Sequence, residues 1–151
     1  MNFFDKNTIG SFKEEYFFLS NFYIHPITYE GLVYPSTEHA YVAAKSNDIN
    51  FKIEVSQVST AGKVKRLGRK VDLIKDWDTK KLIVMEDILR LKFSDPELSA
   101  KLLETGDAPL YEGNWWNDTM WGVNDKTGVG QNNLGKLLMK IRNEKKYKSI
   151  L

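Results

Sequence analysis

The sequence predicts an α+β fold, a single helix-rich domain with a few short strands. Three observations support this prediction. The chain has 151 residues, the length of one domain, and a domain of that size buries roughly 68–70% of its unfolded surface. Its first third contains short extended stretches bounded by turn residues, and the remainder carries apolar stripes at the helical period. We find no repeat, linker or break in composition, so one domain over residues 1–151 is expected.

The first elements are predicted to be two strands and a helix. Residues 24–29 and 32–34 flank Glu30-Gly31, which favours a tight hairpin turn. Pro35 is expected to end the extended structure. Ser36 or Thr37 can then cap a helix that runs through Ser46.

Five more helices follow from the apolar periodicity and from capping residues. The clearest begins at Asp76 or Asp78 and ends at Phe93, and its stripe contains Met85 and Lys92. The others are expected at 49–55, 60–70, 96–104 and 134–145, and a short strand is expected at 109–112.

Composition excludes several classes of protein. The chain has no cysteine, which excludes disulfides and thiolate zinc sites. Only His25 and His39 are present, which argues against a histidine-rich metal centre. Apolar runs such as Leu82 to Met85 are far shorter than a membrane span, and no signal peptide is readable at the start. We therefore expect a cytoplasmic protein without a metal, a cofactor or a membrane partner.

Positive charge is concentrated in one stretch, although the net charge is only +2. Between Lys63 and Lys75 there are six cations and one acid, Asp72, and three more lysines follow Arg142. Such clusters suit phosphate or a nucleic-acid backbone, and the alternative is an ordinary solvated face.

Residues 113–133 form a long loop with four glycines, five asparagines and three tryptophans. A loop of this length inside a compact domain is unusual unless it is functional. Asp118 lies three residues from Trp115 and from Trp121, where a carboxylate could hold ribose hydroxyls or transfer a proton. The alternative is that the tryptophans fill the core, and this alternative stays open for one of Trp115 and Trp116. The following Gly128–Gly135 segment suits phosphate at a helix start but matches no nucleotide-binding fingerprint.

Glu38, Tyr41 and Lys45 share one face of the predicted first helix, because they are three and four residues apart. Taken alone, this stripe could be a surface salt-bridge arrangement. Two details favour a functional site. Glu38 falls in the first turn, where the helix dipole favours an anion, and the neighbouring residues are small or apolar.

These segments together resemble one known family. The motifs that carry the resemblance are Phe18-Leu19-Ser20-Asn21-Phe22, Tyr34 to Tyr41 with Ala44-Lys45, Gly68-Arg69, Trp77, Lys92-Phe93, Leu102 to Gly106, Leu110 with Glu112, Asp118, Trp121-Gly122, Gly128 to Gly135, Leu138-Met139 and Arg142. In this order they are similar to the NADAR (YbiA-like) family over about residues 3 to 143.

The resemblance implies a compact, helix-rich α+β domain that breaks a bond between nitrogen and ribose C1′. Two nucleotide-like substrates are associated with the family: phosphoribosylamino-pyrimidine intermediates of riboflavin synthesis, and ADP-ribosylated guanine in nucleic acid. Glu38 and Lys45 match positions regarded as catalytic, and we add Asp118 as a third catalytic candidate. Substrate contacts are expected from motif residues Ser20, Asn21, Phe22, His39, Tyr41, Arg69, Trp121, Gly122, Gly130 and Asn132.

Two mechanisms remain open from the sequence. In one, Glu38 is the acid and base, and Lys45 traps C1′ of the opened ribose as a Schiff base. In the other, water displaces the base directly, Glu38 and Asp118 divide the carboxylate roles, and Lys45 only holds phosphate or Glu38. Two other functions are alternatives: a non-catalytic module that binds ADP-ribose or NAD, and, more weakly, a nucleic-acid binder that works through residues 63–75.

Overall fold

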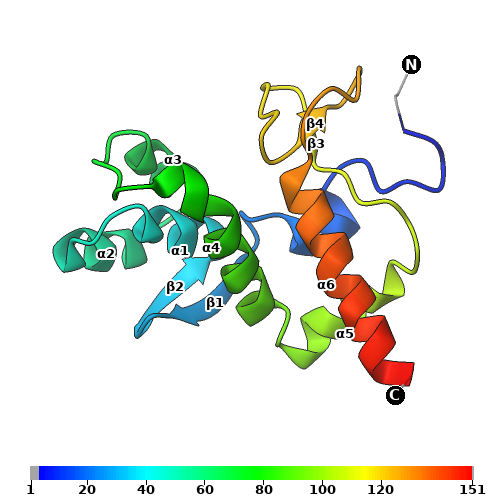
Figure 1. Ribbon diagram of the computed structural model, residues 1–151, viewed down its shortest axis with the longest axis horizontal. Coiled ribbons are helices and arrows are strands. Elements are labelled where there is room, and N and C mark those ends of the chain that lie inside the picture. The colour runs from blue at the N-terminus through cyan, green and yellow to red at the C-terminus, as the bar shows by residue number, and fades with distance from the viewer. Residues whose placement is uncertain (1–3, 151) are drawn as a thin grey trace. The chain divides into compact units, whose positions relative to one another are not determined.

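The computed structural model describes residues 4–150 and divides the chain into two units (Figure 1). The central unit is Asn21–Asp95, and the terminal unit combines Met1–Ser20 with Pro96–Leu151. The prediction that residues 1–151 act as one domain stays a prediction.

The central unit begins with an antiparallel hairpin of β1 (Ile24–Tyr29) and β2 (Leu32–Ser36). Its turn residues, Glu30 and Gly31, have φ angles of 49° and 87°, which is the two-residue turn that matches the twist of the strands. β2 continues through Pro35, so the prediction that this proline ends the extended structure is wrong. The register shifts between Ile24 and Ile27, opposite the proline, and a β-bulge of this kind tolerates a residue without an N–H group.

Four helices complete the central unit: α1 (Thr37–Ala44), α2 (Ile49–Ser56), α3 (Ala61–Gly68) and α4 (Trp77–Lys92). Side-chain oxygens of Ser36, Asp48 and Thr60 cap the first three helices, as sequence patterns of this kind predict. α1 packs against each of the other three helices, and Ala40, Val42 and Ala43 are almost completely buried in the core.

The terminal unit contains a 3₁₀-helix, η1 (Glu14–Leu19), and two α-helices, α5 (Pro96–Glu104) and α6 (Asn133–Ile150). Two-residue strands β3 (Gly113–Asn114) and β4 (Val123–Asn124) pair in parallel. The strand expected at 109–112 is present only as a bridge: Ile9 N donates to Pro109 O and Tyr111 N donates to Ile9 O, each at 2.9 Å. This bridge joins the first residues of the chain to its last third.

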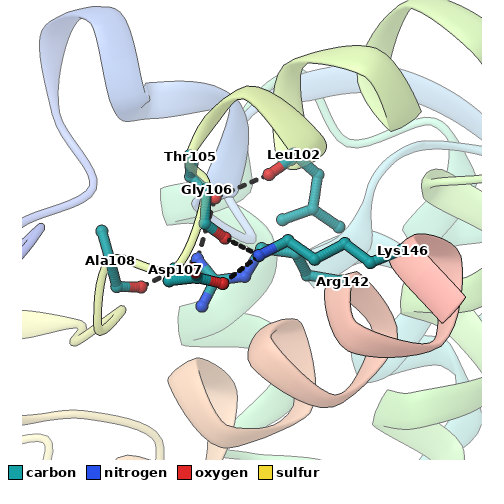
Figure 2. A network of polar contacts seen from close by, with 7 residues as sticks. All are labelled: Leu102, Thr105, Gly106, Asp107, Ala108, Arg142 and Lys146. Atoms are coloured by element: carbon teal, nitrogen blue, oxygen red, sulfur yellow. Dashed lines mark hydrogen bonds and ion pairs between the residues drawn. The ribbon is translucent and has the colours of Figure 1, made fainter.

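Two basic residues of α6 hold the turn that follows α5 (Figure 2). Arg142, which is 3% exposed, donates from Nη1 to Thr105 Oγ1 at 2.9 Å and to Ala108 O at 2.8 Å. Lys146, one helical turn further on, donates to Gly106 O and to the Asp107 carboxylate. The sequence placed these cations in or beside a basic tail, and both of them bind the chain's own backbone.

The helix-rich α+β prediction is confirmed, and each of the expected helices is present. The prediction did not include η1, β3 or β4. Within residues 4–150, no helix is both long enough and apolar enough to cross a bilayer. The described part of the chain also contains no group of three His, Cys, Asp or Glu side chains arranged to hold a metal ion.

Candidate active site

Glu38 lies at the N-terminus of α1, where the backbone favours a negative charge. Its side chain is buried, at 9% exposure, and its backbone N–H donates to Asn21 O at 3.0 Å. Asn21 and Thr37 beside it are also buried, and within residues 4–150 their oxygens Oδ1 and Oγ1 accept and donate no hydrogen bond. The carboxylate therefore lies in an enclosed polar environment, which suits proton transfer better than an exposed position would.

Lys45 follows α1 directly and is partly buried. Burial lowers the pKa of its amine, the charge of Glu38 opposes this, and the cations Lys65, Arg69 and Lys81 lower the pKa further. A lowered pKa increases the fraction of neutral amine, which is the nucleophilic form. Glu38 and Tyr41 are buried, so the alternative of an exposed salt-bridge stripe does not describe this helix face.

Gly68 of α3 lets Lys45 lie close to that helix. A Cβ at this position would come within 2.9 Å of a Val42 methyl and 3.4 Å of Lys45 Nζ. The close packing of α1 on α3 therefore depends on a residue without a side chain, and this packing contributes to the burial of the amine.

Two aromatic residues lie beside these groups. The Lys45 amine is 5.4 Å from the centre of the Tyr41 ring, and that ring packs on Trp77 at 5.3 Å. Tyr41 is 6% exposed, so it supports the site from the core side. Phe22 is partly exposed, and the Lys65 amine lies 5.7 Å from its ring centre.

His39 has a positioning role in the structure. Its ring is fully buried, Nε2 donates to Val58 O at 2.9 Å, and Nδ1 is 2.7 Å from Ser36 Oγ. Burial lowers its pKa, so the ring is neutral, with Nδ1 accepting from the serine hydroxyl. Both ring nitrogens are therefore used within the central unit to hold the start of α1, and contact between His39 and substrate stays a prediction.

The terminal unit contains Ser20 and the remaining candidate residues. Ser20 ends η1, with its N–H bonded to Phe17 O at 2.9 Å. Asp118 is partly buried, and its Oδ1 accepts from Trp121 N at 3.0 Å. Asn114 holds the backbone N–H and C=O of Asp118 through its side-chain amide. Asp118 thus organises a turn of the long loop, and its participation in the chemistry of Glu38 stays a prediction.

Three further candidates of the loop have packing roles. A Cβ at Gly122 would lie 2.1 Å from Glu112 O, and one at Gly130 would lie 2.4 Å from Gly122 O. Gly130 also has a φ of +148°, which L side chains rarely adopt. Asn132 is 3% exposed, donates to Leu110 O at 2.9 Å and accepts from Glu112 N at 3.1 Å. Here the glycines allow backbone to approach backbone, and contact between these loop residues and substrate stays a prediction.

The tryptophans of the loop are more exposed than expected. Trp115 is 72% and Trp116 is 46% exposed, and their rings form an edge-to-face pair at 5.7 Å. The alternative that one of them fills the core is therefore excluded by their exposure. Trp121 is partly exposed, and its carbonyl accepts from Leu134 N at the start of α6.

Comparison with known proteins identifies the class. The chain is 38% identical over 137 residues to the N-glycosidase YbiA of Escherichia coli (strain K12), covering 89% of this chain and 84% of that protein. It is 37% identical over 134 residues to the riboflavin biosynthesis protein VVA0006 of Vibrio vulnificus, covering 87% of this chain but 36% of the longer relative. The NMR structure of E. coli YbiA superposes with a TM-score of 0.82 at 36% identity, covering 97% of this chain and 90% of that one.

The fold and these relatives define an enzyme of the N-glycosidase class, so the non-catalytic binding module is not retained. Residues 3–145 match the model of the NADAR domain. The chain belongs to the NADAR family, and the resemblance seen in its motifs is confirmed.

Proposed function

We propose that this N-glycosidase hydrolyses the bond between a nitrogen base and ribose C1′, in a phosphoribosylamino-pyrimidine intermediate or in ADP-ribosylated guanine. The observation that carries the proposal is the pairing, on one helix, of the buried Glu38 carboxylate with the desolvated Lys45 amine. An acid is needed to protonate the departing nitrogen, and a nucleophile is needed at C1′.

In the scheme that we favour, Glu38 protonates the base as the C1′–N bond breaks. The neutral amine of Lys45 bonds to C1′, and the C1′–O4′ bond then breaks as an amine proton passes to O4′, so that the opened ribose is held as a protonated imine. Water then adds to C1′, with Glu38 as base, and the C1′–Nζ bond breaks to release the ribose aldehyde and the free amine. The pKa of Lys45 is lowered mainly by burial, which supports the amine as nucleophile over a purely electrostatic role.

The substrate is tested by incubation with three compounds: a phosphoribosylamino-pyrimidine, ADP-ribosylated guanosine and NAD. We expect release of free base from one of the first two, measured by liquid chromatography. The name of the Vibrio relative, a riboflavin biosynthesis protein, favours the riboflavin intermediate, and the basic stretch 63–75 favours a nucleic-acid substrate. Release of nothing from all three would remove both substrates from the proposal.

The acid role is tested by Glu38→Gln, which keeps the size of the side chain. We expect a well-folded variant whose turnover falls by at least about 100-fold, the lower end of acid–base contributions. Near-normal turnover by a folded Glu38→Gln protein would show that another group supplies the proton.

The nucleophile is tested by adding borohydride during turnover. Reduction of the imine should leave a sugar-containing adduct, and peptide mass spectrometry should place it on Lys45. Lys45→Arg is the matched control, because it keeps the charge but cannot form the imine. If wild-type protein traps nothing and Lys45→Arg remains active, water attacks directly and Lys45 positions the substrate.

A further inference from the structure

The basic residues of α3 and its C-terminal end form two separate stripes. Lys65 and Arg69 are four residues apart and share one face, whereas Lys63, Arg66 and Lys70 share another. We call the first pair the inner stripe and the other three the outer stripe. Lys65 is partly buried, whereas Arg69 and all members of the outer stripe are exposed.

The inner stripe lies beside the reactive amine. Lys65 and Arg69 both act electrostatically on Lys45, and α3 packs closely on α1 through Gly68. The Lys65 amine lies over the ring of Phe22, 5.7 Å from its centre, which fixes the position of this cation. Lys65 and Arg69 therefore gather near Lys45, together with Lys81 of α4, which is paired with Asp78.

Glu38 acts on Lys45, whereas Lys65 and Arg69 form no ion pair among the described residues. Among residues 4–150, no carboxylate forms an ion pair with Lys65 or Arg69; the acids of the central unit that do form ion pairs bind other cations, such as Lys52, Lys81 and Arg90. Holding like charges together is unfavourable, and a bound anion reverses the sign of this interaction. A second anion bound beside Lys45, in addition to Glu38, would stabilise the arrangement.

We propose that Lys65 and Arg69 form the subsite for the phosphate of the substrate, and that Lys65 determines the preference for a phosphorylated ribose. This inference rests on the proposed function, since the 5′-phosphate belongs to the same ribose whose C1′ meets Lys45. Arg69 can grip two phosphate oxygens with its planar fork, and Lys65 supplies a point charge. Both the monoester of a phosphoribosyl compound and the diphosphate of ADP-ribose have the required chemistry.

Binding of product-like ligands tests the subsite without turnover. Ribose 5-phosphate and ADP-ribose are titrated calorimetrically at constant ionic strength, which separates the monoester from the diphosphate. We expect Lys65→Gln and Arg69→Gln each to weaken binding by about tenfold, the loss of one charge-assisted hydrogen bond. Lys63→Gln, on the outer stripe, is the matched control and should change affinity less than about twofold, as screened surface charges do. An equal loss of affinity in Lys63→Gln would show that the ligand responds to the general positive potential of this surface and not to a defined subsite.

Turnover tests the specificity role. The ratio of kcat/KM for a phosphorylated substrate to that for its dephosphorylated counterpart should fall about tenfold in Lys65→Gln, whereas the ratio in Lys63→Gln should match the wild type. A ratio unchanged in Lys65→Gln would overturn the proposal. If ribose 5-phosphate binds through Lys65 but no substrate releases base, the proposed function fails and the subsite stands. If base is released without any preference for phosphate, the subsite fails and the proposed function stands.

Discussion

Lys92 provides a quantitative test of how the burial of an amine changes the pH dependence of stability in this protein. It is the last residue of α4, is 1% exposed, and its amine lies 5.6 Å from the ring centre of Tyr23 and 5.2 Å from that of Phe93. Burial lowers the pKa of this amine from 10.5 to about 7. The perturbation is Lys92→Met, which keeps an unbranched side chain of similar length but cannot take up a proton.

The expected effect follows from proton linkage. Between pH 7 and pH 10.5 the unfolded chain carries a proton on Lys92 that the folded chain has largely lost. The unfolded state binds more protons, so the free energy of unfolding rises with pH over this window. Integrating from pH 7 to pH 9 with a folded pKa of about 7 gives a gain of about 2 kcal/mol, which Lys92→Met should lack.

The assay is urea denaturation of both proteins at pH 7, 8 and 9. This range avoids Tyr29, whose pKa is raised to about 12 chiefly by burial, so that its ionisation would destabilise the fold at higher pH. The difference in unfolding free energy between wild type and Lys92→Met should shift by about 2 kcal/mol in favour of the wild type. A difference that stays constant within about 0.5 kcal/mol, the usual error of such comparisons, would refute a lowered pKa for Lys92.

Three other predictions concern stability and the loop. His39→Leu should lower the free energy of unfolding by about 2–4 kcal/mol in urea titrations, since it leaves the carbonyl of Val58 unbonded. The free energy of unfolding of the wild type should also fall as pH drops below about 6.5, because His39 is protonated in the unfolded chain before it is protonated in the folded one, and that of His39→Leu should fall less. Gly122→Ala should lower the free energy of unfolding by roughly 1–3 kcal/mol, because the added methyl would meet the backbone carbonyl of Glu112. Gly62→Ala, whose added methyl would enter open space, should raise the free energy of unfolding by up to about 1 kcal/mol. Trp115→Ala should leave stability within about 0.5 kcal/mol and raise KM for a base-carrying substrate about fivefold or more, if this exposed ring stacks on the base; an unchanged KM would exclude it from binding.

Local signals in the sequence predicted most of the elements. The hairpin was readable because Glu30-Gly31 can adopt positive φ angles between two extended runs, and α5 was readable because a proline starts it and Gly106 follows it. β3 and β4 were not readable, since a parallel pair of two residues each depends on contacts between distant segments. η1 is too short to produce a helical period.

The candidate site shows the same division between local and distant information. The spacing of Glu38, Tyr41 and Lys45 identified one helix face, because residues three and four positions apart lie on the same side of a helix. The role of His39 was not predictable, because the carbonyl that it binds is 19 residues away. Lys65 was visible as one cation among six, and only its position over Phe22 separates it from its neighbours.

The bridge between Ile9 and Leu110 has a consequence for biosynthesis. The central unit is one continuous stretch, so its helices can pack as soon as Asp95 has left the ribosome. The terminal unit needs partners from both ends of the chain, and its N-terminal residues must wait until Leu110 and α6 have been made. Closing a loop of this length is entropically unfavourable, although the penalty grows only slowly with length. We therefore expect the half that carries Glu38 and Lys45 to acquire structure first during translation, and the half that carries Asp118 to complete its structure only once Leu110 and α6 have also left the ribosome.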